Sequence, residues 1–267
     1  MKNNLTRHII GDQIYFNVIS DHKFKYNRIS INIITPLEKE SAASYAVLPY
    51  VLKRGYKDCP DFITFHKKLS YLYGASLEAD ISKIGSLQCI ELSIHAIDNR
   101  FTLENEDMIK ECASILSNII VNPNITNDCF DEKNVELEKQ NNIDNIESEI
   151  NDKRSYAVNQ CISLMCKGEK HAIKKYGTIA DVAKITPSSL AQSYHKLIST
   201  ARIEIVFTGS GDATFAKKCF EQSFLAINRT PSIFENQPTK NRADISQEKT
   251  EVTDVNQAKL VLGYRMG

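Results

Sequence analysis

Six histidines are the residues of this chain best suited to hold a catalytic metal, and their spacing limits what they can do. They are His8, His22, His66, His95, His171 and His195. A zinc-peptidase helix needs two imidazoles four residues apart, together with a glutamate that activates the metal-bound water. No two of the six histidines have that separation. The sequence therefore contains neither H-E-x-x-H nor H-x-x-E-H.

The cysteines offer one further metal-like pattern. Cys161, Cys166 and His171 have the spacing C-x4-C-x4-H. Structural zinc sites use tighter pairs and need a fourth ligand, so packing in the core is the favoured interpretation of these three residues. The seven cysteines are odd in number and scattered along the chain. Such a distribution is typical of reduced thiols in a cytosolic protein.

Two other segments have a chemical and a structural interpretation. Gly209-Ser210-Gly211-Asp212 lies between a predicted strand and a predicted helix. It lacks the third glycine and the lysine of phosphate-binding loops, and Asp212 would repel an anion at the helix start, so we predict a connecting turn. Residues 127 to about 166 carry many glutamates, but an apolar stripe among them favours a solvated helix face over a catalytic cluster.

Composition bounds the class of protein. The chain has 267 residues, 42% of them hydrophobic, which suits one large domain or two small ones. Lys plus Arg and Asp plus Glu balance at 33 each, so total charge gives no support for a nucleic-acid or anionic-membrane partner. Residues 1–12 are polar and no segment reaches the length of a membrane span, so we expect neither a signal peptide nor a membrane anchor, and a cytoplasmic location.

Hydrophobic periodicity predicts alternating strands and helices. We expect strands at 13–19, 28–34, 75–84, 87–97 and 202–208, with the first two forming a hairpin or lying side by side and the next two antiparallel. We expect helices at 40–54, 61–73, 106–121, 127–166 with a break at Asn151-Asp152, 186–199 and 214–225. Pro49 falls inside the first helix and predicts a kink or a broken first half there.

These elements predict an α/β (α+β) unit with a mixed, largely antiparallel sheet covered by helices, spanning residues 1–228. Residues 229–250 are polar, include Pro231 and Pro238, and are predicted to be a linker. Residues 251–267 turn apolar again, and 259–264 resembles the strand at 29–34. We therefore expect 251–267 to begin a second, incomplete copy of the unit, and the sequence to be a piece of a longer protein.

The order of these elements resembles the pitrilysin, insulinase and mitochondrial processing peptidase family of zinc metallopeptidases. The resemblance covers most of residues 10–265, and its supporting segments are 31–55, 65–75, 176–178, 186–194, 203–212 and 257–263. Among them, the helix that ends in Lys53-Arg54-Gly55 and the helix that closes in Tyr73-Gly74-Ala75 match in both order and spacing.

Transferring the family's metal site onto this chain leaves no chemistry in it. The first histidine, the glutamate and the second histidine fall on Ala46, Pro49 and Tyr50. The third zinc ligand falls on Lys139, or on Glu138 after a shift of one residue. Alanine cannot ligate zinc, proline cannot accept a proton, and a phenol with a pKa near 10 is a poor zinc ligand at neutral pH. The resemblance therefore implies a degenerate site with no metal, cofactor or catalytic residue.

Family members consist of two similar halves that close around a peptide, or of paired subunits of which one is catalytic. This chain resembles bacterial non-catalytic members, so we expect an inactive subunit, or pseudoenzyme, that forms a peptide-binding chamber as a heterodimer with a catalytic homologue. Its ligand would be a peptide or unfolded polypeptide, held along a sheet edge.

Two alternatives remain open. One is an active zinc peptidase that recruits His66 or His95 with Glu138, which metal content would reveal. The other is a free-standing peptide-binding scaffold, which would lack a co-purifying homologue.

Overall fold

The computed structural model describes residues 5–232, 234, 240–243, 245–252 and 257–266. Six strands form the main sheet: β1 (Leu5–Gly11), β2 (Ile14–Ser20), β3 (Tyr26–Pro36), β4 (Ser76–Ile84), β5 (Leu87–Ile97) and β8 (Arg202–Gly209). The strands β6 (Ile125–Thr126) and β7 (Cys129–Phe130) form a separate pair. The α-helices are α1 (Ala42–Leu52), α2 (Phe62–Tyr71), α3 (Met108–Val121), α4 (Glu132–Ser148), α5 (Lys153–Met165), α6 (Ile179–Ala183), α7 (Pro187–Thr200) and α8 (Thr214–Leu225). Short 3-10 turns are η1 (Asn99–Phe101), η2 (Glu149–Asn151) and η3 (Lys170–Ala172).

The main sheet has the order β1-β2-β8-β3-β5-β4. Every neighbouring pair is antiparallel except β2 and β8, which run parallel. The predicted mixed, largely antiparallel sheet is therefore confirmed, as is the antiparallel pairing of β4 with β5. The prediction that β2 and β3 are neighbours is wrong, because β8 lies between them. In that place the alternating strand β8 gains a hydrogen-bonded partner on both sides.

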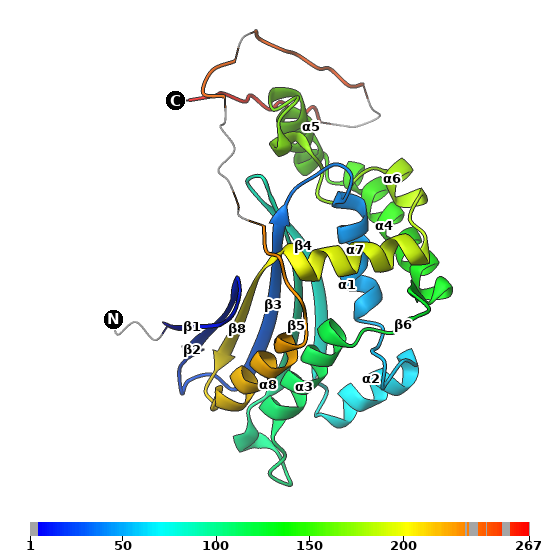
Figure 1. Ribbon diagram of the computed structural model, residues 1–267. Helices are drawn as coiled ribbons and strands as arrows, with labels where there is room; N and C mark the ends of the chain where they lie inside the picture. Colours follow the sequence, from blue (N-terminus) through cyan, green and yellow to red (C-terminus); the bar gives the residue numbers. More distant parts are fainter. Residues whose placement is uncertain (1–4, 233, 235–239, 244, 253–256, 267) are drawn as a thin grey trace.

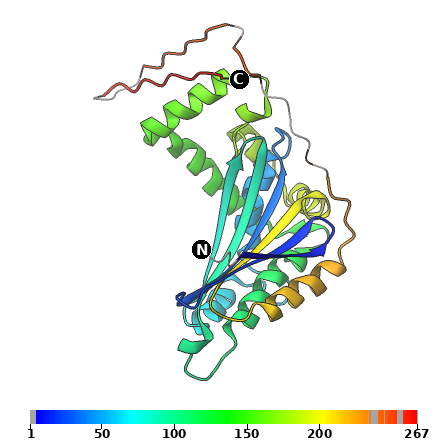
Figure 2. The same ribbon diagram turned by 90° about the vertical axis from the view of Figure 1, so that its left-hand side faces the viewer.

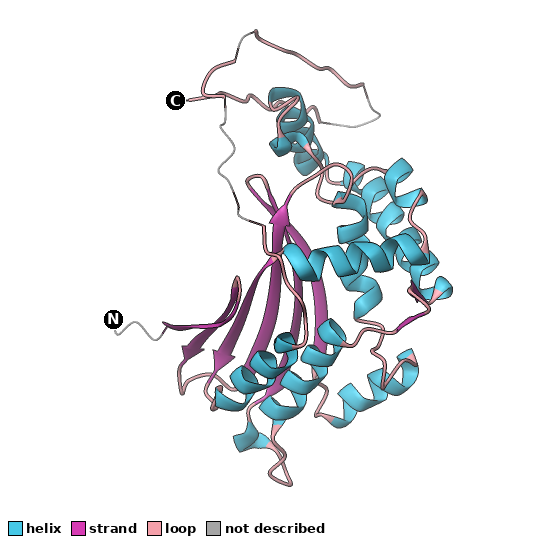
Figure 3. Cartoon of the chain, in the orientation of Figure 1, coloured by secondary structure: helices cyan, strands magenta, loops and turns pink. Residues whose placement is uncertain are grey.

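Helices cover one face of this sheet, and the opposite face carries none of the described helices; we call it the open face (Figures 1, 2 and 3). The two faces differ in chemistry along β8. Ile203, Ile205 and Phe207 are fully buried under the helices, whereas Arg202 and Glu204 alternate with them on the open face. This alternation is the pattern of a strand with one buried face.

The helix α1 runs without interruption from Ala42 to Leu52, with Pro49 inside it. Lys53 N donates to Pro49 O at 3.0 Å, so hydrogen bonding continues past the proline. The expectation of a broken first half is wrong. Nearly every residue of α1 is buried, and packing on this scale overrides the unfavourable propensity of a single proline.

The long helical tract divides as predicted, with α4 and α5 separated by η2 at residues 149–151. The helix α5 has no buried residue and projects beyond the end of the sheet (Figure 1). The described residues after α8 contain no helix or strand, so the strand-like segment 259–264 does not form a strand here. Instead, Arg265 binds Met165 O and Glu169 beside α5. Residues 233, 235–239 and 244 of the expected linker, and 253–256 and 267 of the expected second copy, lie outside the described residues.

Candidate functional site

The helix α1 carries three of the four degenerate positions and contacts α4, α6, α7, β4 and β5. Ala46 is fully buried, Pro49 is buried, and Tyr50 is half-buried. In place of two imidazoles and a carboxylate, α1 offers a methyl group, a pyrrolidine ring and a phenol. At these positions α1 therefore contributes packing and no zinc ligand suited to neutral pH.

The environment of Tyr50 keeps its phenol neutral. Burial raises the pKa of Tyr50 to about 12, and Tyr176, Asp80 and Glu138 add to the upward shift. A phenol with that pKa stays protonated at neutral pH.

The fourth position lies on α4, where both alternatives are buried. The Lys139 side chain donates to Glu136 at 2.8 Å. Glu138 accepts from Arg54 Nη1 at 2.7 Å and from Asn141 Nδ2 at 2.9 Å. The carboxylate of Glu138 is thus neutralised by an arginine that lies one helical turn after Tyr50.

The histidines of the alternative zinc site lie on separate elements. His66 is on α2, where its ring contacts the ring of Phe62 with centroids 4.1 Å apart and planes tilted by 51°. His95 is on β5, where its Nε2 accepts from Arg28 Nε at 3.1 Å on the open face. Within the residues that the structure describes, no three His, Cys, Asp or Glu side chains form a group that could hold a metal ion. Cys161, Cys166 and His171 are among these residues, and all seven cysteines are free thiols.

The resemblance predicts a peptide along a sheet edge without indicating the strand, and the edge strand that contacts α1 is β4. β4 is the last strand of the sheet, and residues 84–87 join it to β5 through a two-residue turn in which Gly85 has φ +61°. In such a hairpin the closing pair, Ile84 and Leu87, is hydrogen-bonded, and the pairs alternate from there. The N–H and C=O groups of Leu77, Ala79 and Ile81 therefore point away from β5, toward the edge.

Neighbouring elements occupy both ends of this edge. Ala75 N donates to Leu69 O and Leu72 O of the α2 end, each at 3.1 Å. Ile81 O accepts from Lys175 Nζ at 2.7 Å. Between them, the outward groups of Leu77 and Ala79 have no hydrogen-bond partner among the described residues. We call Leu77 to Ala79 the edge window.

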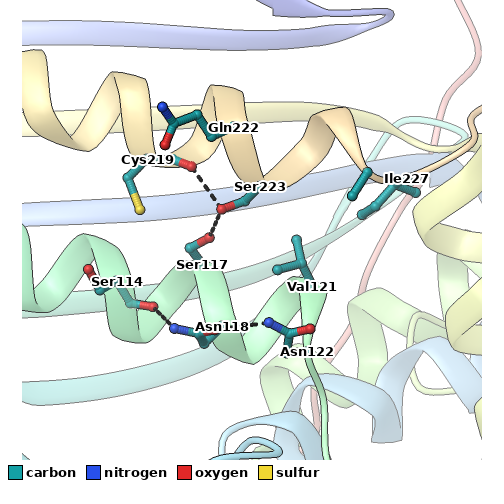
Figure 4. Close-up of a pocket in the computed structure, with 10 residues that line it drawn as sticks. Ser114, Ser117, Asn118, Val121, Asn122, Cys219, Gln222, Ser223 and Ile227 are labelled. Carbon is teal, nitrogen blue, oxygen red and sulfur yellow. Dashed lines mark hydrogen bonds between the residues drawn. The ribbon is translucent and has the colours of Figure 1, made fainter.

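A groove of about 350 Å³ lies elsewhere, between α3 and α8 (Figure 4). Its polar groups bind one another: Ser117 Oγ donates to Ser223 Oγ at 2.7 Å, and Ser223 Oγ donates to Cys219 O at 2.8 Å. Burial raises the pKa of the Cys219 thiol, which disfavours the nucleophilic thiolate. With the Ser117 and Ser223 hydroxyls bonded to each other and no charged residue among those that line it, this groove gives no indication of a catalytic role.

Comparison with known proteins supports the sequence resemblance. No protein-family model matches the chain. "Probable inactive metalloprotease YmfF" of Bacillus subtilis (strain 168) is 28% identical over 252 residues, which cover 93% of this chain and 58% of that protein. A conserved protein from Enterococcus faecalis V583 has a solved structure that aligns with a TM-score of 0.80 and 25% identity, over 90% of this chain and 57% of that chain.

Two more distant structures show the fold alone. A peptidase M16 inactive domain from Pseudomonas fluorescens aligns with a TM-score of 0.67 and 12% identity, over 90% of this chain and 55% of that chain. The first half of the periplasmic protease PqqL from Escherichia coli aligns with a TM-score of 0.71 and 13% identity, over 90% of this chain and 50% of that chain. This chain therefore spans between half and three fifths of the length of these four proteins. No described helix is long and apolar enough to cross a membrane.

Proposed function

We propose that this chain, which resembles the inactive members of the pitrilysin, insulinase and mitochondrial processing peptidase family, holds extended polypeptide without hydrolysing it. The observation that carries the proposal is the edge window. Its unpaired main-chain groups lie on β4, which contacts α1, and the motif positions of α1 supply no metal ligand. Strand addition needs only main-chain N–H and C=O groups, so binding survives the loss of every zinc ligand.

We further propose that the whole protein works beside a catalytic homologue and forms part of the wall of a shared peptide-binding chamber. Relatives about 1.7 times as long as the matched part leave room in the whole protein for a second unit facing this one, and the degenerate positions of α1 leave catalysis to a separate chain. Two units that close over a peptide exclude water, and exclusion of water strengthens polar contacts in the partner's active site.

The variant Ala79→Pro tests peptide holding directly. Proline removes the outward N–H of Ala79 and, at an outward-facing edge position, leaves the ladder to β5 intact. We expect fluorescence anisotropy with a labelled nine-residue peptide of alternating valine and lysine to show binding by the wild type and at least tenfold weaker binding by Ala79→Pro. The control Ala79→Ser keeps the N–H and should bind like the wild type. Equal binding by Ala79→Pro would contradict the proposal.

Co-expression tests the partnership. We expect the complete protein to elute from size-exclusion chromatography together with a homologue that keeps an intact H-x-x-E-H, and to raise that homologue's peptidase activity. Separate elution at micromolar concentration, with full activity of the homologue alone, would favour the free-standing scaffold.

A further inference from the structure

The segment between η3 and α6 is fixed beside the edge of β4. Lys175 O accepts from Gln88 Nε2 at 2.7 Å, and the same amide nitrogen donates to Ala42 O at 3.1 Å. Gln88 is fully buried on β5, so this pair of bonds ties the Lys175 main chain to the sheet and to the start of α1. The position of Lys175 is thereby set by buried structure.

Two lysine side chains then connect this segment to β4 in opposite directions. Lys83 Nζ on β4 donates to His171 O at 2.6 Å and to Ile173 O at 3.1 Å. In return, Lys175 Nζ donates to Ile81 O at 2.7 Å. Ile81 O is the next outward acceptor after those of Leu77 and Ala79. An added strand would need that acceptor in order to extend beyond Ala79.

We propose that Lys175 is a stop for strand addition, which confines a bound peptide to the edge window. This inference rests on the proposed function, since it concerns the extent of the same binding edge. A peptide pairs with Leu77 and Ala79, and the ammonium group on Ile81 O ends the ladder there. The ligand that this predicts is a longer polypeptide of which only a short extended segment pairs with β4.

The side chains of β4 add a preference for charge. Glu78 and Asp80 flank Ala79 on the open face and are exposed, and the other open-face side chains of β4 inside the hairpin, Ser76 and Ser82, are neutral. Opposite charges on adjacent positions of neighbouring strands stabilise their pairing. The segment that fits carries lysine or arginine on the side chains that face the open side of the sheet.

Removal of the Lys175 ammonium group should lengthen the ladder by one acceptor. We compare Lys175→Met with Lys174→Met, since Lys174 binds Glu149 at 3.0 Å and leaves β4 untouched. The probe is the labelled valine-lysine nonapeptide. A single added hydrogen bond corresponds to about three- to tenfold tighter binding. We expect that gain for Lys175→Met, wild-type binding for Lys174→Met, and wild-type binding for Lys175→Arg, which keeps a donor.

A second readout separates the stop from general loosening. Nonapeptides that are N-methylated at one amide each reveal which peptide N–H groups bind to β4. One further amide should become sensitive in Lys175→Met than in the wild type. If the wild type and Lys175→Met bind equally and through the same amides, the stop is overturned while peptide holding stands. If the wild type, Lys174→Met and Lys175→Met all fail to bind, the proposed function itself is contradicted.

Discussion

Polar groups in the loop after β8 are hydrogen-bonded to nearby side chains, whereas several polar groups around α4 and β4 have no partner among the described residues. In the loop, the N–H groups of Ser210 and Gly211 both donate to Asn27 Oδ1, at 3.1 and 3.4 Å. A Cβ atom on Gly209 would lie 2.0 Å from that oxygen, which explains the glycine. The Asn27 side chain thus occupies the main-chain N–H groups that a phosphate would need. The predicted connecting turn is confirmed.

Around α4 and β4 the pairing is incomplete. The edge window leaves main-chain groups unpaired, and Asn142 on α4 is buried with neither amide atom bound to a described residue. Unpaired buried polar groups lower stability, and unpaired groups at a sheet edge can form hydrogen bonds with the strand of another chain. One region therefore pairs its polar groups with one another, whereas the other leaves main-chain groups available to a further strand.

The largest expected effect is on the paired region. Asp98 is buried and accepts from Asn27 Nδ2 at 3.1 Å, Arg100 Nε at 2.8 Å and Ser210 Oγ at 2.5 Å. Asp98→Ala leaves these donors without their acceptor and should lower the free energy of unfolding by about 3 kcal/mol. Urea denaturation measures the change. Asp212→Ala, in the same loop, removes only an exposed cap on Thr214 N and should cost about 1 kcal/mol. Equal losses would show that the buried network around Asp98 adds no more to stability than one exposed cap.

Acid should weaken the same network. Burial raises the pKa of Asp98, but hydrogen bonds from Ser210, Arg100 and Asn27 lower that pKa by a larger amount. The resulting pKa is about 2. A carboxyl group whose folded pKa lies below its unfolded value stabilises the fold above the unfolded pKa, and that stability is lost as pH falls through the folded pKa. The deficit of Asp98→Ala should therefore shrink by about 2 kcal/mol between pH 5 and pH 2. A deficit that stays constant over this range would show that Asp98 acts without its charge.

The smallest expected effect is a gain in the unpaired region. Asn142→Leu replaces an unsatisfied buried amide with an apolar side chain of similar size and should raise the free energy of unfolding by about 1 kcal/mol. Asn141→Leu is the matched control, because Asn141 donates to Glu138 and lies at the surface. It should gain nothing. A loss of stability in Asn142→Leu would indicate that the amide makes a favourable interaction.

Local sequence patterns predicted most helices and strands. The pairing of strands far apart in the sequence could not be predicted from them. The alternation of 75–84 and 87–97 was sufficient for the β4–β5 hairpin, and the helix predicted at 186–199 is present as α7. β1 was missed because it is an edge strand whose residues are mostly exposed and lack alternation. The insertion of β8 between β2 and β3 depends on residues nearly 200 positions apart.

The candidate site likewise has one part that the sequence predicts and one part that depends on the strand order. The degenerate positions Ala46, Pro49, Tyr50 and Lys139 could be read from the resemblance. The edge window could not, because turn spacing tells which groups of β4 point outward, whereas only the strand order shows that nothing pairs with them.

The most direct test of a binder without chemistry measures zinc, cleavage and peptide binding on one purified sample. After dialysis, we expect elemental analysis to find no stoichiometric zinc, mass spectrometry to find the nonapeptide intact, and a chelator to leave peptide binding unchanged. This result follows from the absence of imidazoles at Ala46 and Tyr50 and of a carboxylate at Pro49. One tightly bound zinc per chain, together with peptide cleavage that a chelator abolishes, would contradict the account.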